Sequence, residues 1–308
     1  MTAPQTLLKA WQLRAKKAYG QNFLVNPATA ATIVRQAALS PDQLVLEIGA
    51  GLGALTLPLA ARVRRVVAVE KDGDLIQLLR NELLAAGSQN VTVVHADILR
   101  SDLSTLIAPE RGPMVVMGNL PYNISSQVVL KLLDARVAAR AAARAAPRVA
   151  AREAPREAPR ASVSRAVFMF QKELAERLAA APGSKTYGRL SVILQYCALV
   201  RVLTEIAPTC FHPRPKVASA IVEIRFRKAP ETPARDETLL FRIVRAAFGK
   251  RRKTLKNALT QSDLRLDASA VTAWLARCAI DPRRRAETLS VAEYVTLSNR
   301  FPGNPDAV

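Results

Sequence analysis

Cysteine and histidine are scarce in this chain. Its three cysteines, Cys197, Cys210 and Cys278, are widely separated, and none belongs to a Cys-x-x-Cys spacing. Scattered cysteines of odd number indicate buried thiols of a reducing compartment and argue against a disulfide framework or a zinc site. The two histidines, His95 and His212, are too few for a multi-histidine metal site, and no histidine-based triad is expected.

Acidic residues are also few. The chain has 45 Lys and Arg against 25 Asp and Glu, a formal net charge of +20, and no acidic residue before Asp42. A chain this basic is expected to bind a polyanion such as nucleic acid, because phosphate contacts release condensed counterions. Codon bias toward arginine is an alternative source of part of this excess.

Long apolar runs are absent, with one exception at residues 44–61. That run contains Glu47, three glycines and a proline. These residues suit a strand, a turn and a helix better than a membrane span. We therefore expect no transmembrane helix and no membrane partner.

Short β-branched runs alternate with helical spacing through the first half of the chain. We expect strands buried on both faces at residues 44–48, 66–70, 91–94 and 114–117, and helices at 54–62 and 72–86. Further strands are expected at 166–170, 200–206 and 218–226, and further helices at 172–180 and 190–199. Such alternation predicts an α/β fold with a Rossmann-like, doubly wound parallel sheet. The last two strands follow without a long crossover, which predicts an antiparallel final strand.

The strand signal stops after Lys228. Helical patterns follow at residues 237–248, 255–261, 268–278 and 291–300, and residues 230–236 are expected to form a linker. We therefore predict a catalytic domain over residues 1–229 and a small all-α domain over 230–308.

Residues 136–165 differ from the rest of the chain in composition. They are mainly Ala, Arg, Pro and Val, and the prolines interrupt any helix. We predict a disordered basic insertion, which either adds nonspecific RNA affinity or has no role.

A glycine-rich turn, Glu-Ile-Gly-Ala-Gly-Leu-Gly, occupies residues 47–53 and follows the first predicted strand. Glycines such as Gly49 let the backbone approach a ligand at the carboxyl edge of a sheet. Glu70, 21 residues after Gly49, closes the second strand and can accept both hydroxyls of a ribose. Asp97 after the third strand can accept from an adenine amine, with Ile98 packing on the ring. A dinucleotide site would share these acids, but its glycine spacing is Gly-x-Gly-x-x-Gly, so the pattern favours S-adenosylmethionine.

The segment Asn-Leu-Pro-Tyr at residues 119–122 suits methyl transfer to an exocyclic amine. The lone pair of an adenine amine is delocalised into the ring, so acceptors that draw its N–H bonds make it a better nucleophile. The side-chain oxygen of Asn119 and the main-chain carbonyl of Leu120 can be these acceptors. Pro121 fixes their direction, and Tyr122 can stack on a flipped base. The alternative is an ordinary strand-exit turn with Tyr122 in the core.

The order of these motifs resembles that of the small-subunit rRNA adenine dimethyltransferases. The matching residues are 19–24 (Tyr-Gly-Gln-Asn-Phe-Leu), 47–53, 119–125 (Asn-Leu-Pro-Tyr-Asn-Ile-Ser), 187–192 (Tyr-Gly-Arg-Leu-Ser-Val), 211–217 (Phe-His-Pro-Arg-Pro-Lys-Val) and 248–255 (Phe-Gly-Lys-Arg-Arg-Lys-Thr-Leu). The resemblance covers nearly the whole chain apart from the insertion at 136–165. It implies formation of N6,N6-dimethyladenosine at two adjacent adenines near the 3′ end of 16S rRNA.

The resemblance also implies residue roles. Asn22 and Leu24 would hold the methionine end of the cofactor, and Gly49, Glu70, Asp97 and Asn119 would line the rest of its site. Phe211 would face Tyr122 across the target base, although a buried core phenylalanine is the alternative. The catalytic set is thus Asn119, Leu120, Tyr122 and Phe211.

Basic residues of the C-terminal domain are candidates for RNA contacts. They are Arg242, Arg245, Lys250, Arg251, Arg252, Lys253 and Lys256. Such a density of positive charge suits phosphate contacts, which position a protein without reading sequence, and residues 283–285 (Arg-Arg-Arg) could extend the surface. A solvated basic face is the alternative.

The sequence leaves two other functions open. One is a 23S rRNA adenine N6-methyltransferase of the resistance type, and Leu120 and the helical C-terminal domain favour the small-subunit enzyme over it. The other is an assembly checkpoint factor that acts mainly by binding. DNA-adenine and protein-glutamine methyltransferases would have Pro in place of Leu120. We expect a cytoplasmic monomer with the small ribosomal subunit as its partner and no metal.

Overall fold

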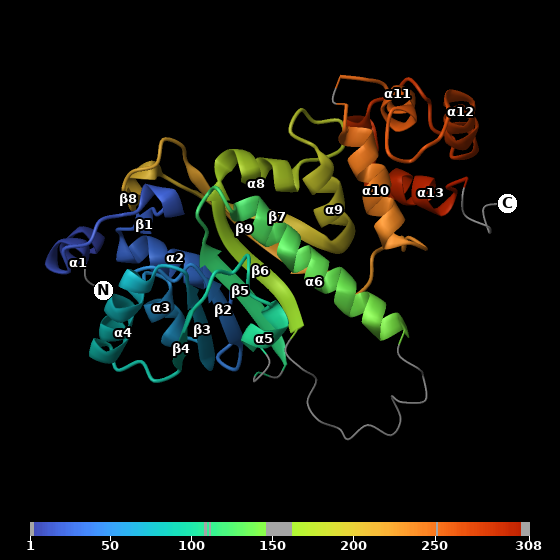
Figure 1. The fold of residues 1–308 in the computed structure, drawn as a ribbon. Helices are drawn as coiled ribbons and strands as arrows, with labels where there is room; N and C mark the ends of the chain where they lie inside the picture. The colour runs from blue at the N-terminus through green and yellow to red at the C-terminus, as the bar shows by residue number, and fades with distance from the viewer. Residues whose placement is uncertain (1–2, 108–109, 111, 146–161, 251, 303–308) are drawn as a thin grey trace, which may run out of the picture. The chain divides into compact units, whose positions relative to one another are not determined.

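Two units make up the fold (Figure 1). The computed structural model describes residues 3–107, 110, 112–145, 162–250 and 252–302. Unit 1 comprises Met1–Ala175 and Arg201–Phe226, and unit 2 comprises Glu176–Val200 and Arg227–Val308. This grouping differs from the predicted boundary after residue 229, because residues 176–200 include a helix that packs on the C-terminal helices.

A seven-stranded sheet organises the described part of unit 1. Its strands, in spatial order, are β4 (Val91–His95), β3 (Arg65–Glu70), β2 (Leu44–Ile48), β5 (Pro113–Asn119), β6 (Ser162–Gln171), β9 (Ser219–Phe226) and β7 (Ala198–Ile206). Neighbouring strands from β4 to β6 are parallel, and β9 pairs antiparallel with β6. The predicted Rossmann-like sheet with an antiparallel final strand is therefore confirmed.

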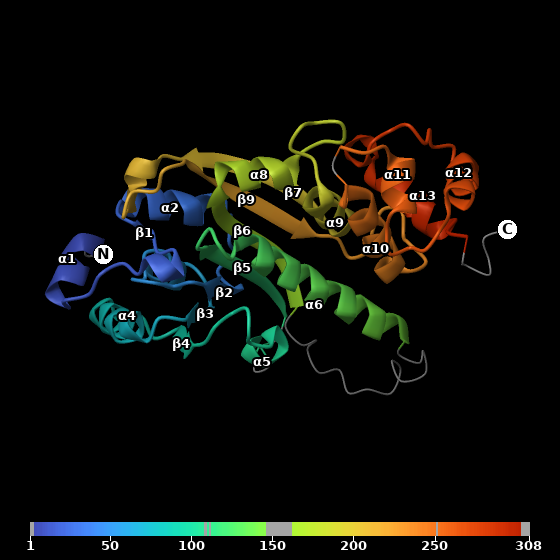
Figure 2. The same ribbon diagram turned by 45° about the horizontal axis from the view of Figure 1, so that its top comes forward.

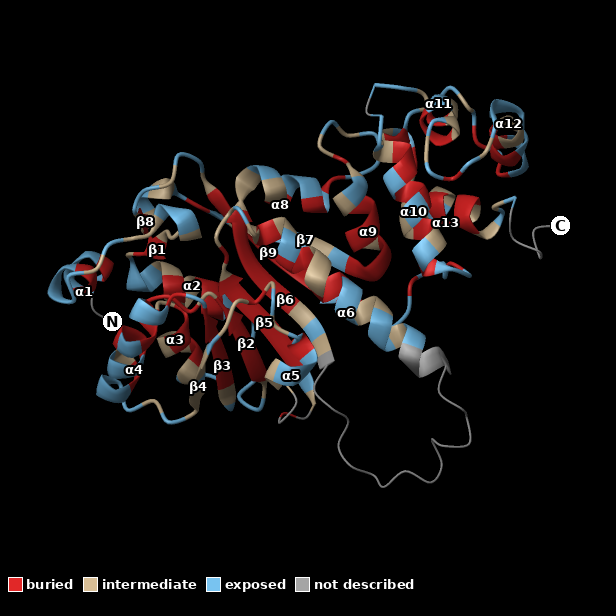
Figure 3. Cartoon of the chain, in the orientation of Figure 1, coloured by how far each residue is buried: buried red, intermediate tan, exposed pale blue. Residues whose placement is uncertain are grey.

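Helices precede, connect or follow the parallel strands β2 to β6. They are α2 (Pro27–Gln36), α3 (Thr56–Ala60), α4 (Gly73–Ala85), α5 (Leu103–Ile107), α6 (Ser125–Ala145) and α8 (Lys172–Ala179). Apolar side chains of α2, α3 and α4 join one buried cluster with alternate residues of β2, β3 and β5. In both views (Figures 1 and 2), α6 runs beside β6. Figure 3 shows the central strands as buried.

Two sequence-based predictions are wrong in this unit. Strand β4 is not buried on both faces, because it lies at the edge of the sheet and each of its residues is partly or fully exposed. The insertion predicted at 136–165 is too wide. Residues 136–145 extend α6 and residues 162–165 begin β6, since an alanine-rich stretch favours helix until a proline follows. The remaining residues, 146–161, lie outside the described part of the chain.

The N-terminal part of the chain forms elements that the sequence did not reveal. Helix α1 (Pro4–Ala10) is followed by the short 3₁₀ helix η1 (Lys17–Tyr19) and strand β1 (Phe23–Leu24). Strand β1 pairs antiparallel with β8 (Phe211–His212), which follows the 3₁₀ helix η2 (Pro208–Cys210). A two-residue strand carries no periodicity, so its pairing could not be predicted.

Unit 2 is helical in its described residues. It contains α9 (Arg189–Cys197), α10 (Glu237–Phe248), α11 (Leu255–Thr260), α12 (Ala268–Arg277), the 3₁₀ helix η3 (Ala286–Thr288) and α13 (Val291–Asn299). The helices predicted after residue 236 are confirmed to within one residue at each end. The side chains of Asp236, Thr254, Asp267 and Ser290 cap the first amides of α10, α11, α12 and α13. The fully buried Trp274 and Tyr294 lie in its core.

Within the described ranges, none of the helices is both long and apolar enough to span a membrane.

Candidate active site

The glycine-rich turn leaves the carboxyl end of β2 in a conformation that glycine alone adopts without strain. Gly49, Gly51 and Gly53 have φ values of 75°, 54° and 81°. A Cβ on Gly53 would also lie 2.9 Å from Cδ1 of Leu79. These glycines therefore let the turn follow a tight path between β2 and α3.

Glu70 ends β3 beside this turn. Its Oε2 accepts from the Gly51 amide and its Oε1 from the amides of Lys71 and Asp72, each at 2.8 Å. Burial raises the pKa of the Glu70 carboxyl, and the three amides act against that rise. The amides thus fix both oxygens in direction and leave Oε2 with capacity to accept a further hydroxyl.

Asp97 follows β4 at the same edge of the sheet. Its Oδ1 accepts from the Leu99 amide at 3.0 Å, and its Oδ2 lies 3.0 Å from Nζ of Lys71. Burial acts to raise the pKa of the Asp97 carboxyl, but the Lys71 and Leu99 hydrogen bonds outweigh it and the pKa is lowered. The carboxylate is therefore ionised and ready to accept from an amine.

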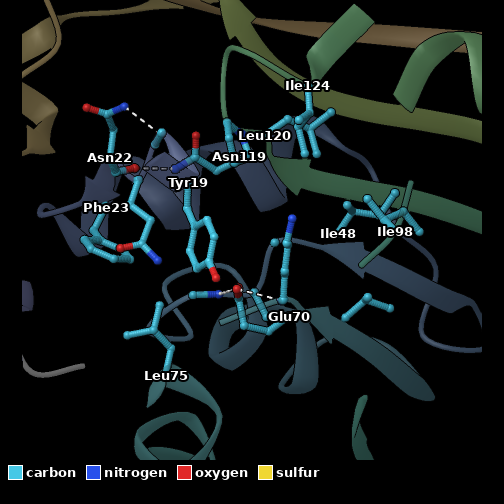
Figure 4. A pocket seen from close by; sticks show the side chains of 18 of the residues that line it. Tyr19, Asn22, Phe23, Ile48, Glu70, Leu75, Ile98, Asn119, Leu120 and Ile124 are labelled. Carbon is cyan, nitrogen blue, oxygen red and sulfur yellow. Dashed lines mark hydrogen bonds between the residues drawn. The ribbon is translucent and has the colours of Figure 1, made fainter. Parts of the chain in front are cut away.

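One pocket joins these residues at the carboxyl edge of the sheet (Figure 4). Its lining includes these residues predicted from the sequence: Asn22, Leu24, Gly49, Glu70, Asp97, Asn119, Leu120 and Tyr122. The side chain of Ile98, 4% exposed, lines the same pocket. Residues from five separate segments thus meet at one site, although their individual roles stay predictions.

The segment 119–122 begins at the last residue of β5, the strand next to β2 and its glycine-rich turn. The Asn119 Nδ2 donates to the main-chain carbonyl of Asn22 at 2.8 Å. The Tyr122 hydroxyl hydrogen-bonds with Oγ of Ser219 at 2.8 Å, and its half-buried position raises the pKa of Tyr122. Both side chains are therefore held by partners far away in the sequence.

Phe211 does not line this pocket. It is 4% exposed and lies in the apolar cluster that includes residues of α2, α3 and α4. In the β1–β8 pair it is the Cα partner of Leu24. The structure thus brings together the other three residues of the predicted catalytic set and places Phe211 in the core beside them. Its role against the target base stays a prediction.

Several lining residues were not given a role from the sequence. Tyr19, Gln21 and Lys71 line the pocket, and each of them contacts a residue of a distant segment. Glu47 also lines it, is 1% exposed, and has an Oε2 atom without a hydrogen-bond partner in the described residues. Burial raises the pKa of Glu47 to about 8; the Thr56 hydroxyl acts against this rise, and the charge of Glu70 acts with it. The glycine-rich motif contains Glu47, but nothing in the motif signals its protonation.

The predicted RNA-binding residues all lie in unit 2. Arg242, Arg245, Lys250, Arg252 and Lys253 are exposed, Lys256 is partly buried, and Arg251 lies outside the described residues. Arg245 is paired with Asp263 at 2.7 Å. In the 283–285 run, Arg284 is bound to Glu293, which leaves less of that run for phosphate than the sequence suggests.

Comparison with known proteins supports one family. The family model described as ribosomal RNA adenine dimethylase matches residues 12–302. The ribosomal RNA small subunit methyltransferase A of Desulforapulum autotrophicum is 44% identical over 299 residues, which cover 97% of this chain and 96% of that protein. The protein of the same name from Anaeromyxobacter sp. (strain K) is 42% identical, with 96% of each chain covered.

Solved structures show the same fold. A dimethyladenosine transferase from Plasmodium falciparum superimposes with a TM-score of 0.67 at 23% identity, over 89% of this chain and 95% of that chain. The 23S rRNA methyltransferase ErmE superimposes with a TM-score of 0.63 at 26% identity, over 91% of this chain and 99% of that chain.

Proposed function

The chain belongs to the ribosomal RNA adenine dimethylase family, and we propose that it methylates N6 of two adjacent adenosines near the 3′ end of 16S rRNA. It is an S-adenosylmethionine-dependent rRNA adenine dimethyltransferase. The two target positions go beyond the names of its relatives and follow from the motifs shared with the family.

The residues present fit the cofactor. An adenosyl group needs an acceptor for its ribose hydroxyls and another for its adenine amine, and the ionised Asp97 and the amide-bound Glu70 lie at one pocket. The turn at residues 49–53 presents backbone without side-chain bulk beside them. When bound, the cofactor supplies a methyl group on a positively charged sulfur.

The observation that supports the transfer step is the hydrogen bond from Asn119 to Asn22. Because Nδ2 of Asn119 donates to that carbonyl, the amide has a fixed orientation and Oδ1 is left to accept from the target amine. The Leu120 carbonyl is the second proposed acceptor. Together they draw the two N–H bonds of the amine to one side and direct its lone pair toward the methyl group.

Tyr122 is proposed to hold the flipped base by its ring face. Its hydroxyl is bound to Ser219, which leaves the ring as its contribution to the pocket. Phe211 is proposed as the opposite wall, which would require movement of a side chain that is now in the core. The exposed basic residues of unit 2 are proposed to bind phosphates of the rRNA.

The small ribosomal subunit is the proposed partner, and the protein is proposed to act on it as a monomer in the cytoplasm. The names of the relatives favour the small subunit, whereas ErmE, which shares the fold, is a 23S rRNA methyltransferase. Residue Leu120 between Asn and Pro also favours the small-subunit enzyme.

The test is transfer of labelled methyl groups from S-adenosylmethionine to unmethylated 30S subunits, with 50S subunits and naked rRNA in parallel. Digested RNA is analysed by mass spectrometry of its nucleosides. Dimethyladenosine in 30S RNA is the expected result. Label in the 50S RNA would support the resistance-type reaction instead, and tight 30S binding without label would support the assembly-factor function.

A further inference from the structure

A short segment between α1 and β1 forms one wall of the cofactor pocket. We call residues 16–22 the strap. Tyr19, Gly20, Gln21 and Asn22 of the strap line the pocket, and in Figure 4 the Tyr19 ring extends from the strap toward Glu70. The strap contains little regular structure beyond η1, so contacts with other segments must hold it in place.

Both ends of the strap meet one buried carboxylate. Nζ of Lys16 lies 2.6 Å from Oδ1 of Asp72, and Nε2 of Gln21 donates to Oδ2 of Asp72 at 2.8 Å. The main-chain amide of Lys16 donates to Oε1 of Gln21 at 2.7 Å, so the two residues that contact Asp72 also contact each other. Nζ of Lys16 also lies 2.7 Å from Oδ2 of Asp74. The Asp72 side chain is only 3% exposed. The hydrogen bonds that Lys16 donates to Asp72 and then to Asp74 raise the pKa of Lys16, so the ammonium stays charged at neutral pH.

The contacts of Lys16 and Gln21 with Asp72, which we call the anchor, are linked to the acids of the pocket. Asp72 lies two residues after Glu70, and its own amide donates to Oε1 of Glu70. The Tyr19 ring centre lies 5.5 Å from Nζ of Lys16 and 5.4 Å from Nζ of Lys71. Lys71 in turn is paired with Asp97. The strap is therefore held against the residues proposed to bind the ribose and the adenine.

The last residue of the strap, Asn22, contacts Asn119, the proposed amine acceptor. Asn22 follows Gln21 directly, and its carbonyl accepts the amide hydrogen of Asn119. A displacement of Gln21 would move this carbonyl and release the Asn119 amide, which could then rotate. The orientation of the proposed amine acceptor thus depends on a contact at Asp72.

We propose that Lys16, Gln21 and Asp72 are positioning residues, which hold the strap as a wall of the cofactor pocket and through Asn22 orient Asn119. This inference deepens the proposed function and rests on it. The anchor touches no reacting atom. Its loss should weaken cofactor binding and should also lower the rate of transfer when the cofactor is saturating.

The test compares Lys16→Met with Lys17→Met. The two variants remove the same charge from adjacent residues. Lys17 belongs to the strap by position, but it is exposed and is not one of the residues that line the pocket, so any general effect of charge on RNA binding is matched. S-adenosylhomocysteine is titrated calorimetrically into each full-length protein without RNA. Because a partly exposed ion pair contributes modestly, Lys16→Met should weaken binding roughly three- to tenfold. Lys17→Met should bind as the unchanged protein does.

Two further measurements separate positioning from a general loss of structure. With saturating S-adenosylmethionine, kcat on 30S subunits should fall in Lys16→Met, remain unchanged in Lys17→Met, and recover in Lys16→Arg, which keeps the charge. The substitution Asp72→Asn keeps a cap for α4. In a double-mutant cycle, its effect should add little to the effect of Lys16→Met.

Equal affinities and equal kcat values for Lys16→Met and Lys17→Met would overturn the inference. Full additivity in the cycle would do so as well. Failure of the unchanged protein to bind S-adenosylhomocysteine would instead contradict the proposed function, so the two failures are distinguishable.

Discussion

The side-chain amide of Asn119 and the main-chain carbonyl of Asn22 are joined by a 2.8 Å hydrogen bond across 97 positions of sequence. An amide can present either its oxygen or its nitrogen to a ligand. This hydrogen bond selects the oxygen, because the nitrogen is already the donor. The N-terminal segment thus fixes the orientation of a side chain at the end of β5.

Replacement of Asn119 by alanine should remove the side-chain acceptor without opening the pocket. We expect methyl transfer to 30S subunits to fall by at least about 100-fold, the scale on which a positioned polar group acts in a transition state. Subunit binding should be nearly unchanged. Asn123→Ala is a matched control, because Asn123 lines the same pocket but is exposed. Near-normal turnover in Asn119→Ala would show that the amide is not the amine acceptor.

The buried Glu47 should make stability depend on pH. Its pKa is raised from 4.5 to about 8, so between these values the unfolded chain releases a proton that the folded protein retains. Stability contributed by the neutral carboxyl is therefore lost as the pH rises through this window. A difference of one between the pKa values of Glu47 in the folded and unfolded states changes the free energy of unfolding by about 1.4 kcal/mol.

Glu47→Gln replaces the carboxyl by a neutral group of the same shape. The variant should resemble the unchanged protein near pH 5 and be more stable at pH 8, which urea unfolding at a series of pH values can measure. Parallel stability curves for the two proteins would mean that Glu47 is ionised in the folded state.

Gly118 should tolerate no side chain. A Cβ at this position would lie 2.3 Å from the carbonyl oxygen of Ile48 on the neighbouring strand, so Gly118→Ala must push β2 and β5 apart next to Asn119. We expect a loss of about 1–3 kcal/mol in unfolding free energy and a loss of transfer. In Gly188→Ala, the nearest atom to the new Cβ is 4.0 Å away, so the effect on unfolding should be smaller. Equal effects would contradict the steric argument.

Basic residues between α10 and α11 should determine how RNA binding responds to salt. Reversing the charge of Arg252 and Lys253 should weaken 30S binding, and the slope of log K against log salt should decrease by about one for each phosphate that the protein no longer neutralises. Reversing Arg62 and Arg64 gives the control, because both are exposed and precede β3 at the edge opposite the pocket. The same change of slope in both pairs would point to net charge alone.

The cofactor half of the site could be predicted because parallel strands impose its geometry. Residues at the carboxyl ends of β2, β3, β4 and β5 meet at one edge of the sheet, so Gly49, Glu70 and Asp97 could be placed at one pocket from their positions, and the family resemblance added Asn119. The antiparallel final strand was predicted from the short connection between the last two strands, and β9 pairs antiparallel with β6.

The strap could not be predicted because its contacts follow no local rule. Lys16 and Asp72 are 56 positions apart, and the exposed lysine next to Lys16 has the same chemistry. Burial of Phe211 beside Leu24 depends on a two-residue strand that has no pattern. Residues 136–145 are helical for another reason: the helix propensity of alanine prevails as far as the first proline of the segment, which comes after residue 145.

The pairing of β1 with β8 also sets an order of events during translation. A ribosome releases Phe23 and Leu24 long before Phe211 and His212, with which they pair. The strap precedes β1, and this pairing cannot support its β1 end until that later strand has been made. A nascent chain therefore cannot complete its cofactor pocket until residue 212 has been synthesised and has left the exit tunnel.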